Sequence, residues 1–106
     1  MTHPVTLEER RAWLEARTGG GPPVLRDRVL EHAAMIEEGD TAAEQVALAA
    51  ERVLAIVEEH PGDRSIALDL LAADALITLA LLAQAEADPD RLGAFTEGLL
   101  AAERIV

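Results

Sequence analysis

Hydrophobic residues recur at helical spacing along nearly the whole chain, and capping residues, glycines and prolines divide this pattern into five segments. The expected helices cover about 7–17, 23–38, 42–60, 64–87 and 89–105. No segment alternates between polar and apolar positions in the way that predicts a strand. The sequence therefore predicts an all-α fold.

The segment 64–87 is the longest expected helix, and it lacks a polar face. On a helical wheel one side is wholly apolar, formed by Leu68, Leu71, Ala72, Ala75, Leu76, Leu79, Leu82 and Ala83. A second apolar stripe lies roughly opposite and consists of Ile66, Leu70, Ile77 and Leu81. A helix at an ordinary domain surface has a single apolar stripe. We therefore expect this helix to be sheltered from water on nearly every side.

Short connections join the segments after residue 23, which favours antiparallel neighbours. We expect an antiparallel up-and-down helical bundle, with four core helices in residues 23–106 and a short N-terminal helix in addition. Four helices would leave part of the segment 64–87 uncovered. The remaining apolar strip should then meet either the N-terminal helix or a second copy of the protein, and we predict a homodimer.

Residues 1–22 are expected to form an N-terminal arm. Its helix begins at Thr6, which has capping-box spacing to Glu9, and it is followed by three glycines and two prolines. This linker is either a tether or a plain loop in a five-helix domain. Leu7, Trp13 and Leu14 are the predicted contact residues of the arm, because tryptophan is common at binding hot spots. The alternative for Trp13 is simple docking of the arm onto its own domain.

Charge and composition exclude several classes of function. The net charge is −11 at pH 7, which repels nucleic acids and anionic membranes. There is no cysteine, so disulfides, thiolate zinc sites and thiol nucleophiles are excluded. The start of the chain lacks an apolar signal core, and we expect a cytoplasmic bacterial protein. The segment 64–87 is long enough to cross a membrane, but Asp69 and Asp74 argue against insertion.

Asp69 and Asp74 are also the most informative polar residues, because a carboxylate in an enclosed helix must be paired, hydrogen-bonded or protonated. The possible ion-pair partners are Arg26, Arg28, Arg52 and Arg104. One interpretation is an ion pair that sets the helix register, and the other is a carboxylate metal site. His32 is expected at the edge of an apolar helix face, as a boundary residue.

A second group of acids should gather at one end of the bundle. It comprises Glu37, Glu38, Asp40, Glu44, Glu86, Asp88 and Asp90. Such a group could attract a divalent cation or a basic partner. Helix caps and the helix dipole favour acids at several of these positions in any case, and no calcium-loop spacing is present.

The stretch Leu-Ala-Ala-Asp74-Ala-Leu-Ile-Thr-Leu-Ala resembles the second metal-binding helix of the all-α nucleotide pyrophosphohydrolases of the MazG kind. The resemblance implies a Mg²⁺ site built from a Glu-x-x-Asp pair on this helix and a Glu-Glu-x-x-Glu set on an earlier one. Here Leu71 stands where that pair has its Glu, and Glu-Glu-x-x-Glu does not occur. Most of the family's metal ligands are thus missing.

Two hypotheses about function follow. The first is a small acidic interaction module that acts as a homodimer, without cofactor or catalytic residues. The second is a divergent enzyme of the MazG kind, with an incomplete metal site at Asp69 and Asp74. The enzyme hypothesis requires both aspartates to face one pocket, whereas the module hypothesis predicts that they contact arginine or solvent.

Overall fold

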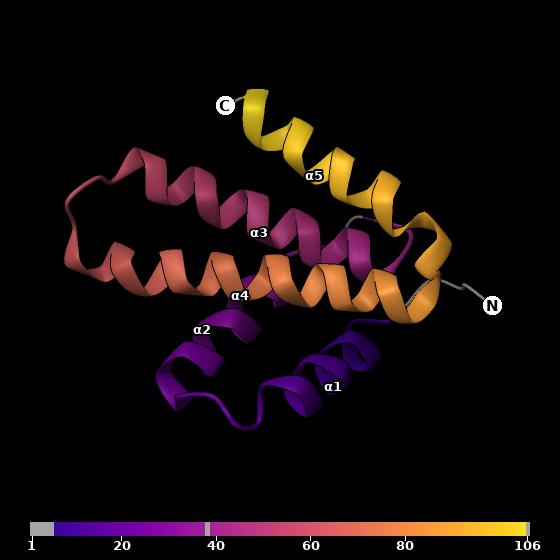
Figure 1. The fold of residues 1–106 in the computed structure, drawn as a ribbon. Helices are drawn as coiled ribbons and strands as arrows, with labels where there is room; N and C mark the ends of the chain where they lie inside the picture. The colour runs from indigo at the N-terminus through magenta and orange to yellow at the C-terminus, as the bar shows by residue number, and fades with distance from the viewer. Residues whose placement is uncertain (1–5, 38, 106) are drawn as a thin grey trace.

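The computed structural model describes residues 6–37 and 39–105, with side chains described as far as residue 101. The described chain is an all-α helical bundle, as the sequence predicts (Figure 1). Its elements are α1 (Leu7–Thr18), α2 (Pro23–Ala34), α3 (Ala42–Glu59), α4 (Arg64–Ala87), the 3-10 turn η1 (Pro89–Arg91) and α5 (Leu92–Ile105).

The centre of the bundle is an antiparallel hairpin of α3 and α4 (Figure 1). Capping starts both helices, since the Thr41 side chain accepts from the Glu44 backbone and the Asp63 side chain accepts from the Ser65 backbone. Small residues let the two helices lie close together. Those fully buried along the hairpin include Val46, Ala49, Ala50 and Val53 of α3, and Ala72, Ala73, Leu76 and Ala80 of α4.

Helix α2 runs obliquely to α4 and buries Val29, Leu30 and Ala33 against the hairpin (Figure 1). It ends at Ala34 and not near residue 38 as expected. The helical ladder tightens there, because the backbone amides of Met35 and Ile36 bond to carbonyls three residues back. The buried Arg10 of α1 then donates to the Ile36 carbonyl at 2.6 Å, which satisfies an acceptor that a longer helix would have used.

Helix α1 packs chiefly on α2, and its Leu14 joins the same hydrophobic cluster as α2, α3 and α4. Leu14 is 1% exposed. The first helix is therefore docked on its own chain. The glycine-proline segment connects α1 and α2, which both contribute to one hydrophobic core.

Helix α5 lies along the outside of the hairpin and makes the looser contacts of the bundle (Figure 1). The chain enters it through η1, so the expected helix from residue 89 starts as one 3-10 turn. The large apolar residues Leu92, Phe95 and Leu99 of this helix are all half-buried. The side chain of Ile105 lies outside the described residues.

The expectation that α4 is sheltered on nearly every side is wrong for a single chain. Among its leucines, Leu70 is 51%, Leu71 56% and Leu82 39% exposed. Helices α2 and α3 pack on the opposite side of α4, where Ala72, Ala73 and Leu76 are buried. Hydrogen bonds from α1 reach α4 near its C-terminal end, at Glu86. The physical reason is that three helices packed on one rod of this length cannot also close its fourth side.

Candidate functional site

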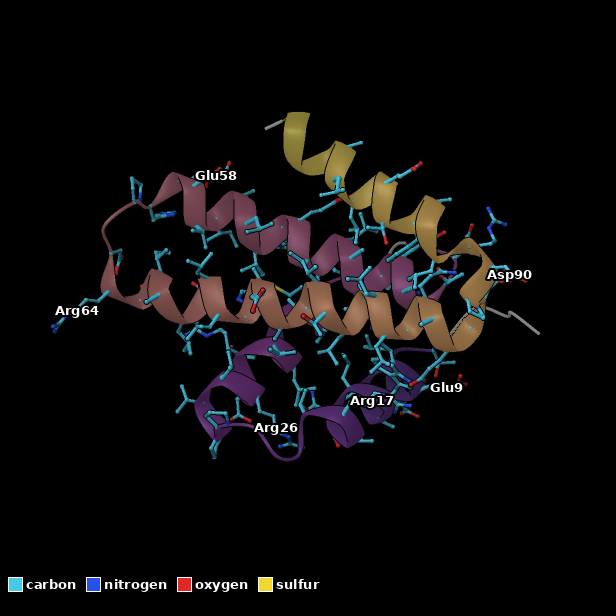
Figure 2. All side chains as sticks on the ribbon, in the orientation of Figure 1. Glu9, Arg17, Arg26, Glu58, Arg64 and Asp90 are labelled. Atoms are coloured by element: carbon cyan, nitrogen blue, oxygen red, sulfur yellow. The ribbon has the colours of Figure 1, made fainter. Side chains whose placement is uncertain are left out.

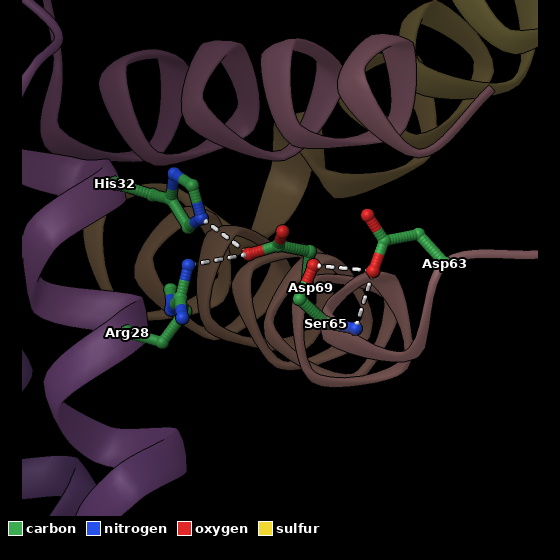
Figure 3. A network of polar contacts seen from close by, with 5 residues as sticks. All are labelled: Arg28, His32, Asp63, Ser65 and Asp69. Atoms are coloured by element: carbon green, nitrogen blue, oxygen red, sulfur yellow. Dashed lines mark hydrogen bonds and ion pairs between the residues drawn. The ribbon is translucent and has the colours of Figure 1, made fainter. Parts of the chain in front are cut away.

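The carboxylate of Asp69 is buried between α4 and α2, where two basic side chains contact it (Figure 3). His32 Nε2 lies 3.0 Å and Arg28 Nη1 3.3 Å from Asp69 Oδ1. Arg28 and His32 are four residues apart, so both project from one face of α2 toward α4. The carboxylate is thus paired, and Arg28 is its partner among the candidate arginines with described side chains. The side chain of Arg104 lies outside the described residues.

Ser65 and Asp63 lie near this pair at the start of α4 (Figure 3). The Ser65 hydroxyl and backbone amide both donate to Asp63 Oδ1 at 2.9 Å. These bonds, the backbone one first, lower the pKa of Asp63 below its ordinary value. Asp63 thus caps the start of α4, and His32 is directed to Asp69 and not to the Ser65 hydroxyl.

Asp74 lies on the opposite flank of α4 from Asp69 and is exposed. Five residues separate the two along the helix, which places their side chains roughly 140° apart around its axis. The described residues contain no group of three or more potential metal ligands. The structure thus does not bring the two candidate metal residues together, and Asp69 meets the ion-pair interpretation.

The predicted contact residues of α1 divide between core and surface. Leu14 is buried, Trp13 is half-buried and Leu7 is 53% exposed. The Trp13 indole donates to Glu86 Oε1 at 3.2 Å, and Arg17 bonds the same carboxylate at 2.8 Å while lying 4.3 Å from the centre of the indole ring. Figure 2 shows Arg17 beneath the last turns of α4. Trp13 therefore docks α1 onto its own chain.

Acidification should loosen this contact. Hydrogen bonds from Arg17, and then from Trp13, lower the pKa of Glu86 below its ordinary value of 4.5. A carboxyl with a lowered folded-state pKa stabilises the fold above its unfolded pKa, and this contribution is lost as the pH falls through the folded value. Fluorescence of the single tryptophan, recorded between pH 6 and about 3, should therefore change below the ordinary glutamate range.

The matched variant for this titration is Glu86→Gln, which keeps an amide oxygen to accept from the indole but cannot change its charge. We expect its fluorescence to vary much less over the same pH range. An equal change in both proteins would show that another group controls the contact.

The acidic group expected at one end of the bundle is present there, since α3 begins and α4 ends on the same side (Figure 1). Glu38 lies outside the described residues. Several members have local partners: Glu86 bonds Arg17, and a Glu44 oxygen accepts from the Asp40 amide at 3.0 Å. Asp88 is the C-cap residue of α4. These acids act mainly at helix ends.

An apolar groove of about 330 Å³ runs between α3 and α5. The sequence patterns did not indicate it, because it results from the loose packing of α5. It is lined by Ala47, Leu48, Ala94, Phe95, Gly98 and Leu99, with Glu44 and Glu51 beside them.

The exposed flank of α4 is the other surface that the sequence did not locate. We define it as Ala67, Leu70, Leu71, Asp74, Thr78 and Leu82, all exposed, together with the half-buried Leu81 and Ala85. The paired leucines at 70–71 and 81–82 were the available signal. A wheel that is apolar all round does not reveal which arc is covered.

By length and composition α4 is long and apolar enough to cross a membrane, and it is the one such helix in the described part of the chain. Its mean hydropathy is 2.1 over the relevant window, of which 39% is buried. The core helix of a soluble protein meets the same test. Comparison of the chain with protein-family models, curated proteins and solved structures finds no match. The resemblance to enzymes of the MazG kind thus has no support beyond the ten-residue segment in α4.

Proposed function

We propose that this protein is a small acidic interaction module that works as a homodimer, and that the exposed flank of α4 is the surface joining the two copies. The observation that carries the proposal is the exposure of Leu70, Leu71 and Leu82 on one side of a helix whose opposite side is buried in the core. Large apolar side chains that share one helix face are typical of an interaction surface.

Two further observations support a second copy as the occupant. The first helix was the other candidate to cover the strip, and it is docked elsewhere, with Leu14 in the core. The flank is also nearly uncharged, with Asp74 as its single ionisable residue. Dimer interfaces have such apolar centres. Burial of the exposed half of each leucine is worth about 1 kcal/mol, and a symmetric contact counts each residue twice.

The net charge of −11 supports a protein partner over a nucleic acid or an anionic membrane. The absence of cysteine is compatible with our placing the protein in the bacterial cytoplasm. The enzyme hypothesis is less well supported, because it needs Asp69 and Asp74 at one pocket and they lie on different sides of α4.

Light scattering tests the proposal. The unmodified protein should have the mass of a dimer, and Leu71→Glu should have the mass of one chain at the same concentration. The substitution places two unpaired carboxylates in the contact and removes two leucines, so we expect dimerisation to weaken roughly 100-fold or more. The fold should survive, because Leu71 is 56% exposed in the single chain.

The matched control is Leu7→Glu, at a leucine of similar exposure on α1. It should leave the dimer mass unchanged. If Leu7→Glu gave monomers and Leu71→Glu did not, α1 would be the contact element and the α4 flank would not. A monomeric unmodified protein would overturn the proposal.

A further inference from the structure

The exposed flank of α4 has a symmetric sequence about Leu76. Ala67 mirrors Ala85, Leu70 mirrors Leu82 and Leu71 mirrors Leu81, each pair lying at equal distances on either side. The innermost pair is Asp74 and Thr78, an acceptor opposite a donor. At about 100° per residue the flank spans an arc of roughly 120°, and Leu76 lies directly opposite its middle. Leu76 itself is fully buried.

On the basis of the proposed dimer, we infer that two copies pair through α4 in antiparallel orientation, with the twofold axis at the level of Leu76, so that Asp74 of each copy accepts a hydrogen bond from Thr78 of the other. An antiparallel pair with this axis brings every flank residue to the height of its mirror position in the second copy.

The leucines and the small residues are complementary in this register. Leu70 and Leu71 of one copy lie at nearly the same height as Leu81 and Leu82 of the other. Mirror residues lie on opposite lateral edges of the contact, so the side chains that meet along one edge are Leu71 and Leu82 of the second copy. Along the other edge Leu70 meets Leu81 of the second copy. Ala67 and Ala85 face each other at both ends, where their small side chains let the helices come close. If the twofold axis were shifted by one helical turn, one leucine pair of each copy would stay exposed to solvent. The apolar contacts therefore favour a single register.

The polar groups are complementary too. No hydrogen bond or ion pair is recorded for the Asp74 carboxylate within the described part of the chain, while the Thr78 hydroxyl donates to the Asp74 backbone oxygen at 3.2 Å. In the dimer that hydroxyl would turn to the carboxylate of the second copy, and a charged acceptor makes the stronger bond. Further out, the exposed Arg64 comes to the level of Asp88 of the second copy.

A parallel pair is less favourable for two reasons. It would set Asp74 directly against Asp74 of the second copy, and like charges repel in an apolar contact. It would also align the dipoles of the two long helices, whereas the antiparallel pair opposes them.

Disulfide trapping tests the register, and the absence of cysteine from the chain makes the background clean. With helix axes ~9 Å apart, the Cα atoms of residue 74 and of residue 78 in the second copy would be roughly 5 Å apart. Two copies of residue 74 would be roughly 7–8 Å apart, beyond the usual range for a disulfide. The test therefore uses Asp74→Cys and Thr78→Cys, which are mixed under reducing conditions and then oxidised with diamide.

We expect the mixed disulfide to form roughly tenfold faster than either homodimeric disulfide, as measured by intact mass with an affinity tag on one variant. Glu58→Cys, at an exposed position of α3 away from the flank (Figure 2), is the control and should stay reduced over the same time. Both flank positions are exposed, so circular dichroism of the variants should match that of the unmodified chain.

The outcomes separate this inference from the proposed function. Faster homodimeric disulfides at 74 and at 78 would show parallel pairing and overturn the register. A dimeric mass without any trapping at these positions would mean that another surface joins the copies, which overturns the register and leaves the homodimer in place. A monomeric mass would overturn both.

Discussion

Leu14→Ala should lower the free energy of unfolding by about 2–5 kcal/mol, the cost of removing a buried leucine from a packed core. Leu14 is 1% exposed and is the residue through which α1 joins the hydrophobic cluster. The whole free energy of unfolding of a domain of this size is about 5–15 kcal/mol. The loss should therefore be large in a urea titration followed by circular dichroism.

Leu7→Ala is the matched control on the same helix, with the same atoms removed at a position that is 53% exposed. It should change the free energy of unfolding by less than about 0.5 kcal/mol. Both variants are measured at one protein concentration, since dimerisation adds to apparent stability. Equal effects of the two substitutions would show that α1 is not docked through Leu14.

Asp69→Ala should cost about 1–3 kcal/mol, because it leaves His32 without its carboxylate partner in a nearly closed site. The His32 side chain is 13% and the Asp69 side chain 8% exposed. Arg28 is 35% exposed and can turn to water, so the loss should be smaller than for a fully buried ion pair. Thermal and urea unfolding of the variant provide the measurement.

Asp74→Ala on the same helix is the comparison. Its carboxylate is exposed, and alanine is the better helix former, so the single chain should lose little or no stability. Low protein concentration keeps any dimer contact out of the comparison. Similar losses from both substitutions would mean that the contacts with Arg28 and His32 do not stabilise the fold.

The helix boundaries show how much local sequence determines. The segment 64–87 was expected as a helix and is α4 with the same bounds, since Asp63 caps its start and Asp88 precedes a proline. Thr6 and Thr41 likewise accept from the backbone three residues on. Local rules did not predict where α2 ends. The helix stops at Ala34 and not near residue 38, and Arg10 donates to the Ile36 carbonyl just beyond it.

The candidate site was less predictable. The sequence indicates that Asp69 needs a partner, but not that His32 and Arg28 both contact it, because that depends on how α2 crosses α4. Asp69 and Asp74 are also not distinguished by the sequence pattern. One is buried and the other exposed, although both interrupt an apolar helix.

The sequence alone therefore determined the helical class, the caps of α1, α3 and α4, and the bounds of α4, because these depend on neighbours within about four residues. Only the tertiary structure decided which arc of α4 is buried, and that α1 is docked through Leu14 and Trp13. The physical reason is that leucine and alanine surround α4 on all sides, so its own pattern carries no preference. The direction from which the other helices approach sets the exposed side.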